Sequence, residues 1–124
     1  MGRIESFKEL IVYQKAYNLA MEIFEISKGF PKEEKYSLTD QIRRSSRSVT
    51  SCIGESWAKR RYEKVFVNKI TDSLSEENET EVWLDYSFSC NYVSEETHNR
   101  TLDGYKEVRL MLISMINHPE KWTI

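Results

Sequence analysis

Two groups of basic residues have the type and spacing that could bind phosphate. The first lies in QIRRSSRSV, residues 41–49, where three arginines stand among small hydroxyl residues. The second is KRRYEK, residues 59–64. Guanidinium and ammonium groups neutralise the phosphates of a nucleic-acid backbone without reading its bases. The candidate contacts to RNA or DNA are Arg43, Arg44, Arg47, Lys59, Arg60, Arg61 and Lys64.

No pattern of a catalytic or metal site accompanies these cations. Glu95 and His98 have the Glu-x-x-His spacing of di-iron bundles, but such a site needs a second pair and two further glutamates. The glycines are isolated, so there is no phosphate-binding loop, and Cys52 and Cys90 lack metal-ligand spacing. We therefore predict a protein that is not an enzyme and that uses no metal and no cofactor.

The net charge limits how such a protein can use its cations. A formal net charge of −2 argues against indiscriminate coating of nucleic acid. The charge is unevenly distributed, however: residues 43–69 hold eight basic and two acidic residues, whereas residues 70–99 hold eight acidic residues and no Lys or Arg. The sequence predicts a molecule with a basic side and an acidic side.

The chain is expected to form a single domain over residues 1–124. Its length is typical of one domain, and a hydrophobic content of 40% is enough for one core. It has no apolar run that could span a bilayer, and its first residues are too charged for a signal peptide. We expect a cytoplasmic protein that has no membrane partner and whose two cysteines are reduced.

The sequence predicts a helical protein, because apolar side chains recur at spacings of three and four and the chain has only two prolines. The basic residues are therefore expected to be positioned by helices. Capping residues, Gly29 and the prolines set the expected limits. The four expected helices run from Phe7 to Lys28, from a cap near Ser37 or Thr39 to about Lys59, from Glu63 to Cys90, and from behind Ser94 to a point before Pro119. Short connections between them predict an all-α, antiparallel up-down four-helix bundle.

The first expected helix carries apolar side chains on two nearly opposite faces. One face holds Leu10, Tyr13, Tyr17, Met21 and Phe24, and the other holds Val12, Ala16, Leu19, Ile23 and Ile26. Since one bundle core needs only one such face, the second face indicates a partner surface. The alternative is a central helix that is wholly buried.

The third expected helix also has more apolar side chains than its core face needs. Val82, Trp83 and Tyr86 project away from that face, and with Glu81 they are the predicted interface of a homo-oligomer. Glu77 and Glu81 fall along the core face, where carboxylates are costly unless paired. We expect them to reach an arginine of another helix or subunit, or the helix to turn outward there; catalysis is a third alternative.

The arginines of the second expected helix face outward. Its inner face is formed by Leu38, Ile42, Ser46, Val49, Ile53 and Trp57. Ser45 and Ser46 are small enough to let a neighbouring helix approach closely. Arg43, Arg44 and Arg47 lie well around the helix from Ile42. The alternative to a phosphate site is therefore a solvated face supported by Asp40, three and four residues before the paired arginines.

The chain resembles a known family. The resemblance rests on three segments: F-x-x-L-x-VYQKA at residues 7–16, FPKEEKY at residues 30–36, and LTDQIRRS at residues 38–45. It continues through YVSEE at residues 92–96. These segments resemble the four-helix-bundle family of proteins encoded in bacterial 23S ribosomal RNA intervening sequences. The likeness covers nearly the whole chain.

The resemblance implies a ring-like homopentamer and a kinship with the accessory variability determinant proteins of diversity-generating retroelements. Those relatives are associated with nucleic acid and a reverse transcriptase, which makes a reverse transcriptase a further expected partner. Most family members have no established biochemical activity. Arg43 and Arg44 occupy the family's paired-arginine position. The chain departs from the family at residues 48–56, SVTSCIGES, where SIPSNIAEG is usual, and at Glu77 and Thr80, where leucines are expected.

Two functional hypotheses follow. The first is a non-enzymatic, homo-oligomeric binding module whose ligand is RNA or DNA and whose contact surface is the basic segment. The second is a structural or protein-interaction scaffold without nucleic-acid binding, in which the basic residues serve the protein itself. The low net charge favours the second, and the clustering of cations fits both.

The charge pattern generates a prediction about assembly. A basic patch that meets an acidic patch on the next subunit forms a head-to-tail contact, and such contacts close into rings. Buried aromatic residues dominate interface energies, whereas charges mainly set orientation and association rate. We predict a cyclic oligomer, for which the family resemblance implies five subunits, that assembles more slowly in high salt but persists. Trp83→Ala should shift it toward monomer far more than Arg47→Ala, as measured by light scattering.

A monomeric parent protein would contradict the ring outright. Equal effects of the two substitutions would remove Trp83 as its anchor.

Overall fold

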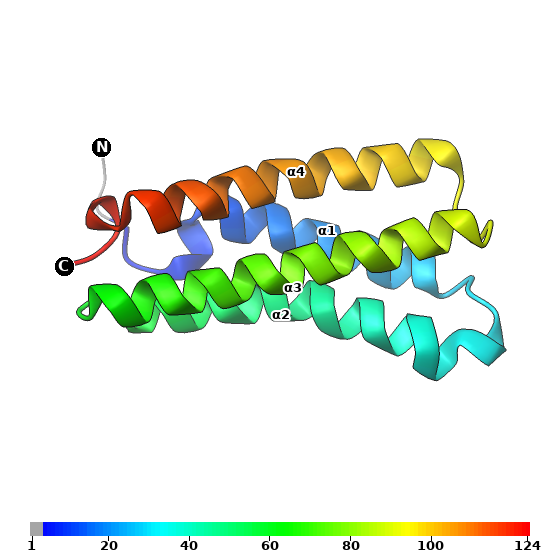
Figure 1. Cartoon of the computed structure of the whole chain (residues 1–124), viewed down its shortest axis with the longest axis horizontal. Coiled ribbons are helices and arrows are strands. Elements are labelled where there is room, and N and C mark those ends of the chain that lie inside the picture. The colour runs from blue at the N-terminus through cyan, green and yellow to red at the C-terminus, as the bar shows by residue number, and fades with distance from the viewer. Residues whose placement is uncertain (1–3) are drawn as a thin grey trace.

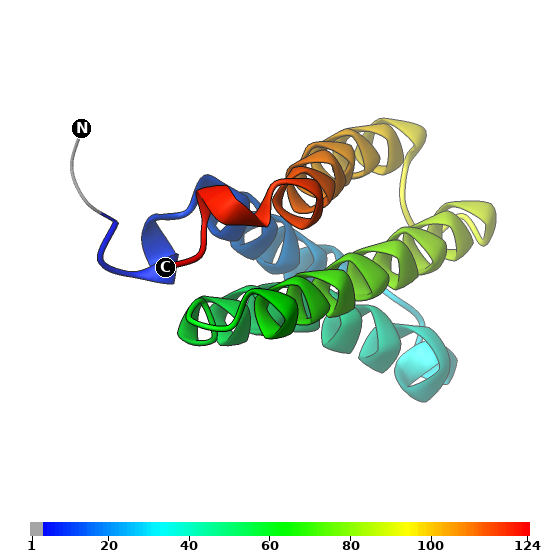
Figure 2. The same cartoon turned by 60° about the vertical axis from the view of Figure 1, so that its left-hand side comes forward.

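The computed structural model describes residues 4–124, and within them four long helices form the body of the protein. These are α1 (Ile11–Ser27), α2 (Asp40–Ala58), α3 (Glu63–Ser89) and α4 (Glu95–Asn117). Successive helices run in opposite directions in both views (Figures 1 and 2). The predicted all-α, up-down four-helix bundle is confirmed.

The limits of α3 and α4 agree with the sequence prediction. The hydroxyl of Ser94 accepts a hydrogen bond from the backbone N–H of Thr97, as an N-cap residue should. Helix α4 then ends at Asn117, before Pro119 begins the short helix η4 (Pro119–Lys121). Helix α3 ends one residue before the predicted Cys90.

The prediction that the first helix begins at Phe7 is wrong. Residues Phe7–Glu9 form a separate 3₁₀ turn, η1, and Leu10 is extended before α1 begins. A capping box closes this turn: Ser6 Oγ accepts from the backbone N–H of Lys8, and the Glu9 carboxylate accepts from that of Ser6. The Ser6-x-x-Glu9 spacing is a helix-start signal that the apolar periodicity concealed.

The predicted N-cap of the second helix is also wrong. A 3₁₀ turn, η2 (Lys32–Glu34), and a π-helical turn, η3 (Lys35–Thr39), lead directly into α2. Thr39 already has helical backbone angles and its side chain caps nothing, while the Ser37 hydroxyl donates to Glu34 Oε1 at 2.6 Å. The buried side chains of Leu38 and Thr39 hold this wide turn against the bundle.

Helix α1 is not wholly buried, so that alternative is wrong. Val12, Ala16 and Ile23 lie in the core, whereas Tyr17 and Met21 on the other face are 49% and 45% exposed. One face of α1 therefore builds the core, as the two-face pattern predicts, and the other leaves apolar surface in solvent.

Helices α2 and α3 pack along a seam of small hydroxyl residues. We call Ser45, Ser73 and Thr80 the hydroxyl seam; none of the three is exposed to solvent. Ser73 Oγ donates to the Val49 carbonyl oxygen at 2.7 Å, and the Thr80 and Ser45 hydroxyl oxygens lie 2.8 Å apart. These bonds satisfy buried polar groups and fix the register of one helix on the other.

Three further properties concern the described residues. Cys52 and Cys90 are both free. No helix within residues 4–124 combines the length and apolar character needed to cross a membrane. In the same range, His, Cys, Asp and Glu side chains do not gather in threes or more in a way that could hold a metal ion.

The hydroxyl seam predicts an asymmetry between small and large substitutions at Ser73. Ser73→Ala should lower the free energy of unfolding by about 1 kcal/mol, because it removes one buried hydrogen bond. Ser73→Leu should lower it by a further ~1–3 kcal/mol, because the larger side chain forces the helices apart. Urea unfolding measures both, with Ser75→Leu at an exposed position of α3 as control. A Ser73→Leu variant as stable as the parent would show that the seam does not set the helix separation.

Candidate nucleic-acid interface

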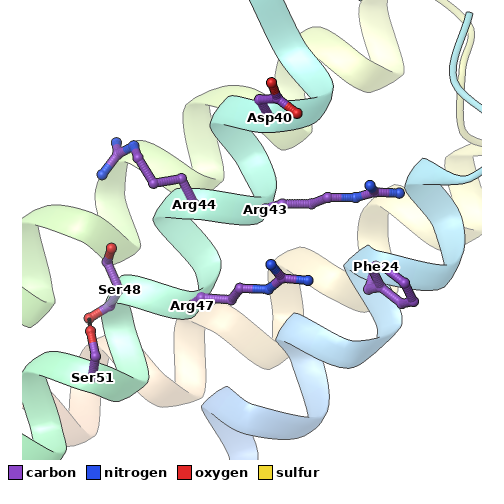
Figure 3. Close-up of a pocket in the computed structure, with 7 residues that line it drawn as sticks. All are labelled: Phe24, Asp40, Arg43, Arg44, Arg47, Ser48 and Ser51. Carbon is purple, nitrogen blue, oxygen red and sulfur yellow. Dashed lines mark hydrogen bonds between the residues drawn. The ribbon is translucent and has the colours of Figure 1, made fainter. Parts of the chain in front are cut away.

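The predicted basic residues occupy three different environments. Arg44 is turned toward α3, where its guanidinium pairs with Glu76 at 3.1 Å and also with Glu79. The hydrogen bond to Glu76 and the charges of both carboxylates raise its pKa. Figure 3 shows Arg44 pointing away from Arg43 and Arg47. Arg44 thus links α2 to α3 within the subunit.

Arg43 and Arg47 extend together across α2 toward α1 (Figure 3). Their guanidinium carbons lie 4.8 and 5.7 Å from the centre of the Phe24 ring. A groove of about 670 Å³, which we call the arginine groove, lies here; Phe24, Asp40, Ser48 and Ser51 complete its lining, with Arg44 at its edge. The cations rest on an aromatic face, which attracts them electrostatically.

The remaining four cations lie at the turn that joins α2 to α3. The side chains of Lys59, Arg61 and Lys64 are exposed, and no ion pair holds any of them within residues 4–124. Arg60 instead folds back: its guanidinium lies 3.8 Å from the Trp57 ring centre and its Nε donates to the Trp57 carbonyl. We call residues 59–64 the basic turn.

The expected separation into a basic and an acidic side needs revision. Acidic α3 lies beside basic α2, and the two helices neutralise each other in part through Arg44 with Glu76 and Glu79 and through Lys69 with Glu55, whose charged atoms lie 2.9 Å apart. Asp40, the expected support of the arginines, forms no ion pair in the described part of the chain. What remains of the basic segment is the arginine groove and the basic turn.

The predicted interface residues are also divided by the structure. Val82 and Tyr86 are 48% and 56% exposed one helical turn apart on α3. Trp83 is half-buried against the core, and its indole N–H donates to Glu79 at 3.0 Å. Glu81 pairs with Arg109 of α4 at 2.7 Å, which confirms the expectation that it reaches an arginine of another helix. The exposed apolar surface of α3 therefore centres on Val82 and Tyr86.

Glu77, unlike Glu81, forms no ion pair with an arginine within residues 4–124. Its side chain is fully buried, and neither carboxyl oxygen has a hydrogen-bond partner within residues 4–124. Burial, reinforced by the negative charge of Glu81, raises the pKa of Glu77 to about 9 against an ordinary value of 4.5. The hydroxyl of Tyr105 is likewise buried without a partner, and burial and the charge of Glu77 raise its pKa. The bundle core thus holds a carboxyl group that is neutral at pH 7.

Sequence reasoning did not identify Phe24 and Tyr62 as parts of the basic surfaces. Phe24 lies on α1, and nothing local in the sequence shows that α1 brings it beneath two arginines of α2. Tyr62 does carry a signal, because it stands between Arg61 and Lys64 and is 59% exposed. An aromatic ring among cations is a feature of surfaces that bind single-stranded nucleic acid.

The chain is similar to a known protein family and to solved structures. The model of the 23S rRNA-intervening sequence protein family matches residues 8–114. The fold is similar to the crystal structure of a protein of unknown function from the S23 ribosomal protein family of Bacteroides thetaiotaomicron VPI-5482, with a TM-score of 0.76 and 29% sequence identity over 86% of this chain and 96% of that one. None of the curated proteins matches the chain.

The buried carboxyl group predicts a pH-dependent loss of stability. The folded state keeps the Glu77 proton up to about pH 9, whereas the unfolded chain releases it near 4.5, so stability from this group falls as pH rises between those values. Glu77→Gln, which cannot ionise, should gain stability relative to the parent as pH rises from about 5 to 9. Glu77→Leu should be more stable by about 1–3 kcal/mol at neutral pH, because a buried unpaired polar group is lost.

Denaturant unfolding at several pH values measures these differences. Asp103→Asn, at an exposed position of α4, serves as control and should show no growing difference. A Glu77→Gln difference that stays constant with pH would mean that Glu77 ionises normally in the fold.

Proposed function

The chain belongs to the 23S rRNA-intervening sequence protein family, and from this premise we propose that it is a non-enzymatic, homo-oligomeric bundle that binds the phosphate backbone of RNA or DNA. The observation that supports this proposal is the basic turn. Lys59, Arg61 and Lys64 are exposed there and form no ion pair within residues 4–124, and the exposed ring of Tyr62 stands among them. The four residues offer charge for phosphates and a ring for base stacking at one end of the bundle.

Binding of this kind is independent of base sequence. Exposed ammonium and guanidinium groups at a turn neutralise phosphates without reading base edges. The arrangement suits a flexible strand or loop that can lay one base on Tyr62 while its phosphates contact the flanking cations. We therefore propose single-stranded segments as the preferred ligand. A reverse transcriptase is a further proposed partner, which rests on the sequence resemblance to retroelement proteins alone.

A second proposed function is a protein-interaction scaffold without nucleic-acid binding. It is favoured by the exposed apolar residues on two helices, Tyr17 and Met21 on α1 and Val82 and Tyr86 on α3. Surplus apolar surface of this kind marks contacts with other proteins or with further copies of the same chain. The same surfaces would assemble the homo-oligomer of the first proposal, so nucleic-acid binding distinguishes the two.

The basic turn predicts salt-dependent binding that three substitutions weaken. The parent protein should bind a single-stranded 20-mer of RNA at about 50 mM salt and lose affinity steeply by about 200 mM, because bound counterions are released on binding. Replacing Lys59, Arg61 and Lys64 together by Gln should weaken binding at least tenfold and reduce the slope of log affinity against log salt by about 0.7 per lost phosphate contact. Filter binding measures both quantities.

The matched control replaces Lys32, Lys35 and Lys106 by Gln, which removes the same charge from exposed positions elsewhere on the molecule. Light scattering on both variants shows whether assembly is unchanged. Absence of binding by the parent at about 50 mM salt, where phosphate contacts are strongest, would leave the scaffold as the better function. Equal weakening in both variants would mean that net charge, and not the basic turn, attracts the strand.

A further inference from the structure

The arginine groove holds two cations that the fold brings together without neutralising them. Arg43 and Arg47 both lie over the ring of Phe24, and Lys28 Nζ is 4.8 Å from the centre of the same ring. Lys28 pairs with Glu25, whereas within residues 4–124 neither Arg43 nor Arg47 takes part in an ion pair. Like charges held close together are unfavourable, so an anion between them would stabilise the arrangement.

Arg43 is held in a fixed orientation. Its Nε donates to Ser27 Oγ at 2.7 Å, and the Ser27 hydroxyl, which is buried, donates in turn to the Phe24 carbonyl oxygen at 3.0 Å. The bond to Ser27 uses the Nε–H of the Arg43 guanidinium group. Its two terminal nitrogens, which make no hydrogen bond in the described structure, remain available to the groove. A preorganised donor pair of this kind loses little entropy when it binds an anion.

Arg47 supplies the second, more exposed cation. It lies one helical turn after Arg43 on α2, and Figure 3 shows both side chains extending in the same direction. The hydroxyl of Ser48 lines the same groove and forms no hydrogen bond with residues 4–124. The groove therefore offers two guanidinium groups to a single ligand, whereas Figure 3 shows the Ser48 side chain on the other side of α2, away from them.

We propose that the arginine groove binds a terminal phosphate group, either that of a phosphate monoester or inorganic phosphate itself, between Arg43 and Arg47. A monoester carries close to two negative charges at neutral pH, which match two guanidinium groups, and its oxygens suit their forked donors. The ligand is a nucleotide, inorganic phosphate or the terminal phosphate of a nucleic-acid strand. This site lies on the α1–α2 side of the bundle, apart from the basic turn, and does not depend on the proposed backbone binding there.

Calorimetric titration tests the site with inorganic phosphate, with AMP, and with an RNA hexamer that carries either a 5′-phosphate or a 5′-hydroxyl. The parent should bind the phosphate-bearing ligands. Arg47→Gln, an exposed position whose loss leaves the Arg43–Ser27 bond intact, should weaken that binding at least tenfold. Lys106→Gln removes the same charge from an exposed position of α4, outside both surfaces, and should change that binding by less than twofold. Inorganic phosphate and AMP, which offer no strand to the basic turn, test the groove separately from the first proposal.

The pattern of ligands identifies the source of the phosphate. A preference for the 5′-phosphorylated hexamer over the 5′-hydroxyl hexamer that depends on Arg47 supports a strand terminus, and equal binding of AMP and inorganic phosphate supports a free ion. No binding of any phosphate ligand by the parent at about 10 mM, where even a weak site with a Kd of about 1 mM would fill, overturns the proposal. It is also overturned if Arg47→Gln lowers the mass in light scattering and leaves phosphate binding unchanged, because the groove would then be a contact between subunits.

Discussion

The packing of α2 on α3 is the constraint on which the other features depend. The hydroxyl seam of Ser45, Ser73 and Thr80 lets the two helices approach closely and fixes their register through bonds at 2.7 and 2.8 Å. In that register Arg44 faces Glu76 and Glu79 and forms ion pairs with both. Arg43 and Arg47 extend in the opposite direction, toward α1. The basic turn lies at the end of the bundle because it joins α2 to α3.

The sequence predicts the fold well because long amphipathic helices carry their own periodicity. The limits of α3 and α4 follow from Ser94, Pro119 and the uninterrupted stretch between Glu63 and Ser89. The two errors fall where local hydrogen bonds compete with that periodicity. At Ser6 and Glu9 a capping box closes a separate turn, and before Asp40 a π-helical turn replaces a side-chain cap. Apolar spacing alone distinguishes neither of these from a continuing helix.

The candidate sites were predictable only as a set of residues. Seven cations could be named from their clustering, but which of them would be free depended on side chains from other helices. Glu76 on α3 removes Arg44 from the set, and Phe24 on α1 gathers Arg43 and Arg47. Those contacts join positions far apart in the chain, and pattern within one helix contains no information about them. Trp57, which covers one face of Arg60, was identified as a core residue but not as a partner of that arginine.

Both ends of the described chain lie beside the basic turn. The backbone N–H of Ile124 donates to the Arg60 carbonyl at 3.3 Å, and Figure 1 shows η1 and η4 at the same end of the bundle as the α2–α3 connection. A polypeptide fused to residue 124, such as an affinity tag or a fluorescent protein, therefore emerges next to the cations. An acidic tag there would compete for them, whereas an insertion in the loop before α2, at the far end of the bundle, would leave them accessible.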